Sequence, residues 1–138
     1  MLESLIGAAV GALTILIARL IRGQRWLYAL GLVTLPSLYA SFALHVGELS
    51  IGVKEMIYGI PFLVAGLVFT FVGFRYSAIA VSVLWILHGL YDLIHSRLIT
   101  NVGVPDWYPV WCCAVDIVVG GYLLWLSRRV PEANLRRA

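Results

Sequence analysis

The stretch Ser77–His95, SAIAVSVLWILHGLYDLIH, decides the fold class, because it is nearly apolar over the length of a membrane. A transmembrane helix needs about 20 mostly apolar residues. The ionisable residues of this stretch are His88, Asp92 and His95, all in its second half. We therefore interpret it as a membrane-spanning helix that carries a polar face.

The composition of the whole chain supports this interpretation. Of its 138 residues, 62% are hydrophobic and only 12% are charged. Soluble domains average about a quarter charged residues, so the composition indicates a membrane protein surrounded by the lipid bilayer. The net charge of +3 does not indicate a nucleic-acid partner, because the basic residues stand at the ends of apolar segments, where they act as topology signals.

Five apolar windows are long enough to span a membrane, and short breaks with turn-forming residues separate them. The first window is interpreted as a retained span and not a signal peptide, because its arginines follow the apolar run. The sequence thus predicts an all-α bundle of five transmembrane helices in one domain, 1–127, with a basic tail, 128–138. The predicted spans are 4–20, 26–46, 56–73, 77–95 and 107–126.

The distribution of basic residues predicts the orientation of these spans. Two of the predicted loops and the C-terminus share one side, and it carries Arg19, Arg22, Arg25, Arg75, Arg128, Arg129, Arg136 and Arg137. The other side carries only Lys54 and Arg97. Because cytoplasmic loops are enriched in Lys and Arg, we expect the N-terminus outside and the C-terminus in the cytoplasm. The predicted location is a bacterial or archaeal cell membrane.

With this topology, the other titratable residues gather at one depth. All three histidines and six of the seven acidic residues fall in the outer half of the bundle or at its outer surface, and Glu132 is the exception. Charged groups inside a membrane are costly and usually face a bundle interior or a cavity. The sequence therefore predicts a polar functional site in the outer half.

Helical geometry places His88, Asp92 and His95 on one narrow stripe. At 100° per residue, Asp92 lies about 40° and His95 about 20° from His88 around the helix axis. Along the axis, His88 and His95 are roughly 10.5 Å apart. One metal ion cannot easily bind both, because metal–ligand bonds are about 2 Å long. Asp92 lies one turn from each histidine and can serve either, as a ligand or as an orienting hydrogen-bond partner.

The polar residues together suit a metal site built from nitrogen and oxygen ligands, with zinc, iron or manganese as candidate ions. The predicted ligands are His45, Glu48, His88, Asp92, His95 and Asp116. The first three are expected to form one half-site and the last three the other, with Glu55 within reach. Asp92 or Asp116 would be the general base in a hydrolytic reaction. The adjacent Cys112 and Cys113 indicate no disulfide framework. They precede Asp116 by four and three residues and could add a thiolate, but they stay outside the predicted ligand set.

Two resemblances accompany these residues. His88, Gly89, Asp92 and His95 match an H-G-x-x-D-x-x-H signature, and the chain resembles a group of uncharacterised small bacterial and archaeal membrane proteins that carry it in a late span. That resemblance implies no particular activity.

A second, partial likeness concerns the chemistry of the site alone. Ser41-x-x-x-His45 is similar to the first element of the alkaline ceramidase and adiponectin-receptor superfamily, seven-span zinc-dependent hydrolases, and Asp92 could stand for their acid. The chain departs from that pattern, since five spans are predicted and His88 and His95 are seven residues apart rather than four.

Four functions are compatible with the sequence. The first is a metal-dependent membrane enzyme that acts on a lipid-like substrate. The second is an electron-transfer subunit with a b-type haem, whose axial ligands would be His45 and either His88 or His95. The third is a proton- or ion-coupled transporter or a sensor. The fourth is an accessory subunit. The small residues Gly7 and Gly11 favour close helix contact, within the chain or in a homo-oligomer.

Overall fold

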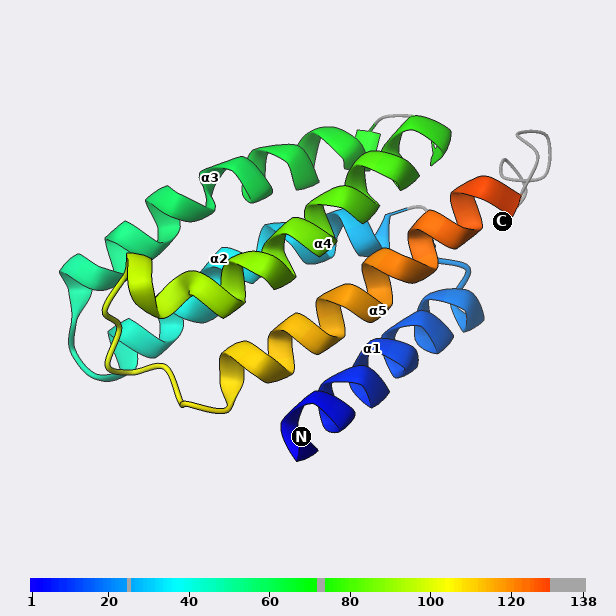
Figure 1. The fold of residues 1–138 in the computed structure, drawn as a ribbon. Helices are drawn as coiled ribbons and strands as arrows, with labels where there is room; N and C mark the ends of the chain where they lie inside the picture. Colours follow the sequence, from blue (N-terminus) through cyan, green and yellow to red (C-terminus); the bar gives the residue numbers. More distant parts are fainter. Residues whose placement is uncertain (25, 72–73, 130–138) are drawn as a thin grey trace.

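The chain folds into an antiparallel bundle of α-helices. The computed structural model describes residues 1–24, 26–71 and 74–129, and their elements are α1 (Leu2–Leu20), α2 (Leu27–His45), α3 (Leu49–Phe71), α4 (Phe74–Leu98) and α5 (Tyr108–Arg129). Successive helices run in opposite directions, which places the start of α1 and the end of α5 at opposite ends of the bundle (Figure 1). The predicted all-α, five-helix class is confirmed.

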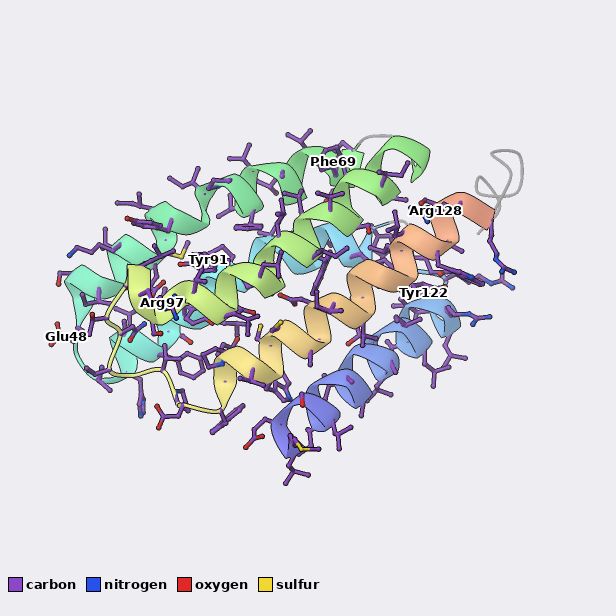
Figure 2. The ribbon with its side chains drawn as sticks, viewed as in Figure 1. Glu48, Phe69, Tyr91, Arg97, Tyr122 and Arg128 are labelled. Carbon is purple, nitrogen blue, oxygen red and sulfur yellow. The ribbon has the colours of Figure 1, made fainter. Side chains whose placement is uncertain are left out.

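Some sequence predictions fall on residues outside the described ranges. They concern Arg25, the break at Gly73 and the part of the basic tail beyond Arg129. The expected orientation in the membrane stays a prediction. Figure 2 shows the two ends to which it refers, with Glu48 and Arg97 at one and Arg128 at the other. We call the end with Glu48 the outer end, after that prediction.

The side chains that face away from the bundle axis are mostly apolar. All five helices are long and apolar enough to cross a membrane. Large hydrophobic side chains stay exposed along their length, among them Leu13, Leu16, Ile57, Val64, Leu87 and Ile94. A water-soluble protein rarely exposes apolar surface so continuously, whereas lipid tails solvate it well. The chain is therefore a multi-pass membrane protein.

The connection between α2 and α3 is shorter than the sequence suggested. Helix α2 ends at His45, and Gly47 adopts a φ of +82°, which favours glycine. The amide of Gly47 donates to the carbonyl of Leu44 (3.0 Å) and the amide of Glu48 to that of Ala43 (2.9 Å). This is a Schellman motif, which ends one helix and lets the next begin almost at once. Helix α3 therefore starts at Leu49 and not at residue 56, so that Lys54 and Glu55 are helical.

Glycines at every seventh position of α3 let it pack closely on α2. These are Gly52, Gly59 and Gly66, all buried. A Cβ atom on Gly59 would overlap the ring of Pro36, and one on Gly66 would lie 2.7 Å from the carbonyl oxygen of Ala29. A seven-residue repeat keeps one face of a helix turned to an antiparallel neighbour over two turns at a time. Helices α2 and α3 thus form one tight hairpin.

This packing predicts a stability difference between two glycine substitutions. Gly59→Ala is expected to lower the free energy of unfolding by about 1–3 kcal/mol, because the added methyl group overpacks the contact with Pro36. Gly121→Ala is the matched control, since no atom lies within 4 Å of its Cβ position and alanine favours a helix interior by about 0.5–1 kcal/mol. Thermal unfolding in mild detergent measures both. A Gly59→Ala protein as stable as Gly121→Ala would contradict the close contact.

Helix α1 uses its small residues within the chain. Gly7 and Gly11 are buried, and a Cβ atom on Gly11 would lie 3.0 Å from both the carbonyl oxygen of Val115 and the Cβ of Val118 on α5. The sequence left open whether this face packs within the chain or in a homo-oligomer. The structure shows it packed against α5 of the same chain. A homo-oligomer through the same face would have to displace α5.

The two halves of the bundle interior differ in chemistry. The half near the arginine-rich end holds an apolar core that includes Tyr28, Leu32, Trp85, Val119 and Leu123. The buried charged or titratable polar groups, His88, Asp92, His95, Asp116 and Glu55, lie in the other half. The predicted concentration of polar residues in one half of the bundle is therefore present, and it defines the candidate site.

Candidate metal centre

A close crossing of α4 and α5 builds the centre of the site. Gly89 on α4 faces Asp116, whose Cβ would lie 3.0 Å from a Cβ added to that glycine. One turn beyond Asp116 on α5, the carbonyl oxygen of Gly120 accepts a hydrogen bond from the Ser82 hydroxyl (2.7 Å). The lack of side chains at the two glycines brings the helix backbones together. The polar stripe of α4 consequently lies against Asp116.

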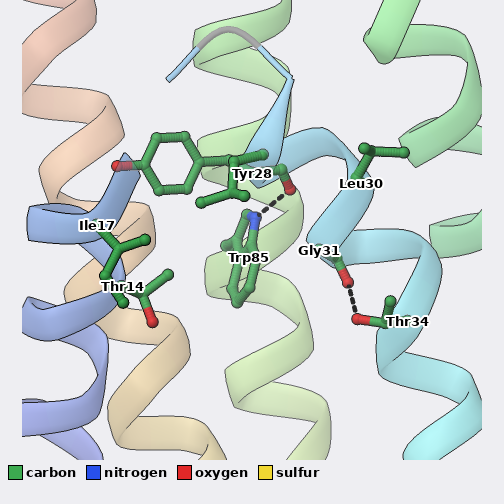
Figure 3. Close-up of a pocket in the computed structure, with 8 residues that line it drawn as sticks. Thr14, Ile17, Tyr28, Leu30, Gly31, Thr34 and Trp85 are labelled. Carbon is green, nitrogen blue, oxygen red and sulfur yellow. Dashed lines mark hydrogen bonds between the residues drawn. The ribbon is translucent and has the colours of Figure 1, made fainter. Parts of the chain in front are cut away.

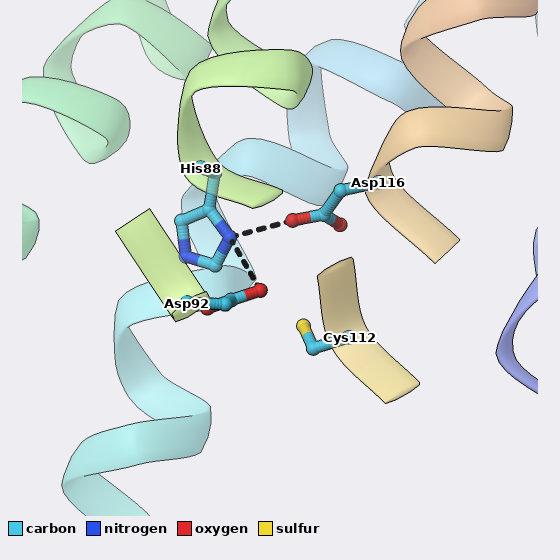
Figure 4. A group of neighbouring side chains, drawn as sticks. All are labelled: His88, Asp92, Cys112 and Asp116. Atoms are coloured by element: carbon cyan, nitrogen blue, oxygen red, sulfur yellow. Dashed lines mark hydrogen bonds and ion pairs between the residues drawn. The ribbon is translucent and has the colours of Figure 1, made fainter. Parts of the chain in front are cut away.

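Four buried side chains meet at this crossing, and we call them the central cluster: His88, Asp92, Cys112 and Asp116. The Nδ1 atom of His88 lies 2.7 Å from Asp116 Oδ2 and 3.6 Å from Asp92 Oδ2 (Figure 4). None of the four residues is more than 3% exposed. The cluster thus concentrates two carboxyl groups, an imidazole and a thiol in a volume closed to solvent.

The central cluster leaves two carboxylate oxygens unsatisfied. Asp92 Oδ1 accepts a hydrogen bond from the Tyr39 hydroxyl (2.9 Å), but Asp92 Oδ2 and Asp116 Oδ1 are buried and have no hydrogen-bond partner. Buried polar atoms are nearly always paired, and an exception calls for an explanation such as an ion. When both acidic groups are ionised, they carry more negative charge than a single histidine can balance, so their burial requires a proton or a cation. A bound cation would satisfy both requirements.

The spacing of the donor atoms fits one metal ion. Each of the four residues offers one ligand atom, and these atoms all lie within 4.8 Å of one another. With metal–ligand bonds of 2.0–2.3 Å, tetrahedral zinc ligands are roughly 3.5 Å apart, so a small inward movement of the side chains would complete the coordination. The donor types, nitrogen, oxygen and sulfur, are those that bind zinc.

Cys112 is the member of the cluster that the sequence analysis left out of the ligand set. It precedes Asp116 by four residues, the same spacing that joins His88 to Asp92. Residues four apart share a helix face, so the pattern was visible in the sequence. The sequence suggested a thiolate donor here, but it did not show that α4 pairs with α5, which brings Cys112 to His88 and Asp92.

His95 belongs to a separate group nearer the outer end, which we call the end pair: Glu55 and His95. The Nε2 atom of His95 lies 2.9 and 3.0 Å from the two carboxylate oxygens of Glu55. Asn101 donates from Nδ2 to Glu55 Oε1 (2.9 Å) and to the backbone oxygen of Tyr39 (3.0 Å). The Tyr39 ring stacks on His95 with centroids 4.0 Å apart. Tyr39 therefore touches both groups of polar residues.

These positions correct the predicted half-sites. His88, Asp92 and Asp116 come together, but His88 joins the two aspartates and not His45 and Glu48. Both of the latter are exposed at the outer end, because α2 stops at His45 and the Schellman turn directs Glu48 away from the bundle (Figure 2). His95 pairs with Glu55 and does not join Asp116.

The same positions bear on the haem and hydrolase comparisons. His45 and Ser41 are exposed, whereas His88 and His95 are each held by a carboxylate. Among the described residues, no two histidines face each other across a space for a haem. Ser41 donates its hydroxyl to the carbonyl of Leu38 (2.6 Å) and lies outside the cluster.

Two of the cavities among the described residues lie near the site, one beside His88 and one in the apolar half of the bundle. The larger, about 390 Å³, lies between α1, α2 and α4, where the indole nitrogen of Trp85 donates to the carbonyl oxygen of Tyr28 (3.0 Å) (Figure 3). Its lining holds no acid, histidine or cysteine, so it offers no chemistry beyond contact with a lipid tail. The smaller, about 10 Å³, lies between α2, α3 and α4 and is lined by both His88 and Glu55.

No protein-family model, curated protein or solved structure matches the chain. The two resemblances noted from the sequence therefore stay expectations. The function has to be inferred from the geometry of the site.

Proposed function

We propose that this protein is a multi-pass protein of a bacterial or archaeal cell membrane that binds one divalent metal ion, zinc by preference and iron as the alternative. The ion would lie between α4 and α5, held by His88, Asp92, Cys112 and Asp116. The observation that carries the proposal is the pair of buried carboxylate oxygens without a hydrogen-bond partner, one on each aspartate, beside an imidazole and a thiol.

A purely structural role explains the cluster less well. Polar contacts between membrane helices contribute only about 0.6 kcal/mol on average, and a His–Asp pair alone would provide such a contact. The second carboxyl group adds a buried negative charge, whose desolvation costs several kcal/mol unless a cation or a proton compensates it. Cys112 adds a fourth donor at the same place. A metal ion would make use of all four groups.

The geometry favours metal binding over catalysis on a large substrate. Structural zinc sites are closed by four protein ligands, whereas catalytic sites keep a coordination position open. Here four protein donors surround the central position, and the adjoining cavity of about 10 Å³ has no room for a lipid. Asp92 and Asp116 would then act as ligands. Hydrolysis of a lipid-like substrate would require α3 and α4 to separate beside His88.

The proposal is tested by elemental analysis of protein purified in mild detergent without chelator. We expect close to one zinc or iron per chain in the wild type and in His45→Ala, a control whose histidine lies outside the cluster. The double variant His88→Ala/Asp92→Ala should contain none. Wild-type protein that stays metal-free after incubation with zinc and with iron would overturn the proposal.

A further inference from the structure

The small cavity lies between Glu55 of the end pair and His88 of the central cluster. Its wall includes Glu55 from α3, His88 from α4, and the aromatic side chains of Tyr39, Tyr58, Phe62 and Tyr91. The Nδ1 atom of His88 faces Asp116 and Asp92 (Figure 4). His88 therefore belongs both to the proposed metal site and to the wall of the cavity.

The size of the cavity limits what can occupy it. At about 10 Å³ it accepts an ion or a single water molecule, and nothing larger. Tyr58 also belongs to its lining and is 53% exposed, so this wall separates the cavity from the surroundings of the bundle. Tyr91, from α4, lies between α3 and α4 in the view of Figure 2.

The carboxylate of Glu55 is fixed at this cavity by hydrogen bonds. Glu55 is 3% exposed, and both of its carboxylate oxygens lie within hydrogen-bond distance of the His95 imidazole. One of these oxygens also accepts a hydrogen bond from Asn101. These contacts come from α4 and from the segment that follows it, so they fix the carboxylate at the outer side of the cavity. A fixed, buried carboxylate is a ligand that a divalent cation prefers when it leaves water.

We infer that the cavity is the passage by which the metal ion reaches its site, and that Glu55 binds the ion transiently before His88 receives it. This inference rests on the proposed function, since it assigns a route to the same ion. The ion would exchange water ligands for the Glu55 carboxylate, cross the cavity, and then bind the central cluster. His95 and Asn101 are positioning residues for Glu55.

Metal exchange kinetics test the inference with Co²⁺, whose absorption reports binding. Full-length protein in detergent is mixed with Co²⁺ to measure loading, and loaded protein is mixed with a chelator to measure release. A ligand used only during passage lowers the barrier in both directions. Glu55→Gln is therefore expected to slow loading and release by the same factor, about tenfold or more, and to leave the dissociation constant unchanged. Glu48→Gln, an exposed glutamate at the same end, should match the wild type.

A second variant acts in the opposite direction. Tyr58→Ala removes an exposed part of the cavity wall and should speed both loading and release. Wild-type rates in both Glu55→Gln and Tyr58→Ala would overturn the passage, and so would a change of the release rate alone in Glu55→Gln, since Glu55 would then hold the bound ion. If Glu55→Gln does not fold, Tyr58→Ala still decides. Wild-type protein that binds no Co²⁺ would instead refute the proposed function.

Discussion

Cobalt-loaded wild-type protein is expected to show a sulfur-to-cobalt charge-transfer band in the near ultraviolet, and Cys112→Ser is expected to abolish it. The thiol of Cys112 is 3% exposed and belongs to the central cluster. A thiolate bound to Co²⁺ gives this band, and a serine hydroxyl does not. The absorption spectrum of each loaded variant measures the effect directly.

Cys113→Ser is the matched control for this prediction. Adjacent residues on a helix point about 100° apart, so Cys113 does not share the face of Cys112, and it is only half-buried. Its substitution should keep both the band and the affinity. Cys112→Ser should also weaken binding by more than the 10–100-fold that is typical when only a hydrogen-bond partner of a ligand is lost. A band that survives Cys112→Ser would remove sulfur from the ligand set.

The fold followed from features that act within single segments. Each apolar window is long enough to cross a membrane by itself, so the five helices could be read from composition and length. The stripe formed by His88 and Asp92 could be read in the same way, because it depends only on helix geometry. Even the early start of α3 has a local cause, the turn at Gly47. This turn lies in a loop that the sequence predicted to be longer than it is.

The composition of the site depended on contacts between segments. Asp116 lies against the polar stripe of α4, and Cys112 joins the cluster because Gly89 and Gly120 let α4 and α5 approach closely. His95 pairs with Glu55 because Gly52, Gly59 and Gly66 set the register of α3 against α2. This register turns Glu55 toward the interior of the bundle. Such registers arise from steric fit between surfaces far apart in the sequence, and one sequence does not reveal them.

The effect of Asp116→Asn on the free energy of unfolding is expected to change sign with metal. Without metal, the variant should be more stable than the wild type by about 1–3 kcal/mol, the cost of a buried unsatisfied polar group. The asparagine oxygen can still accept from His88, which lies 2.7 Å from Asp116 Oδ2. Its amide can donate to the unpartnered Asp92 Oδ2. The substitution also removes one of two neighbouring buried negative charges.

With zinc the order should reverse. A ligand that binds only the folded state stabilises it by about 2.7 kcal/mol at a concentration 100 times its dissociation constant. The wild type should gain this stability, and Asp116→Asn should gain little, because a neutral amide oxygen is a poor zinc ligand. Thermal unfolding in detergent, with a chelator and with zinc, measures both proteins. Asp106→Asn, an exposed carboxylate near the start of α5, is the control and should follow the wild type in both conditions.

The reversal separates a metal site from an ion pair that only holds helices together. If a protonated His88 paired with Asp116 were the purpose of the cluster, removing the carboxylate charge would leave a buried cation with a weaker partner, and the variant would be less stable in chelator as well. If a metal is the missing charge, the wild type carries a destabilising excess of negative charge until the ion binds. A wild type that is more stable than Asp116→Asn in chelator, and that zinc does not stabilise further, would therefore assign the cluster to helix packing.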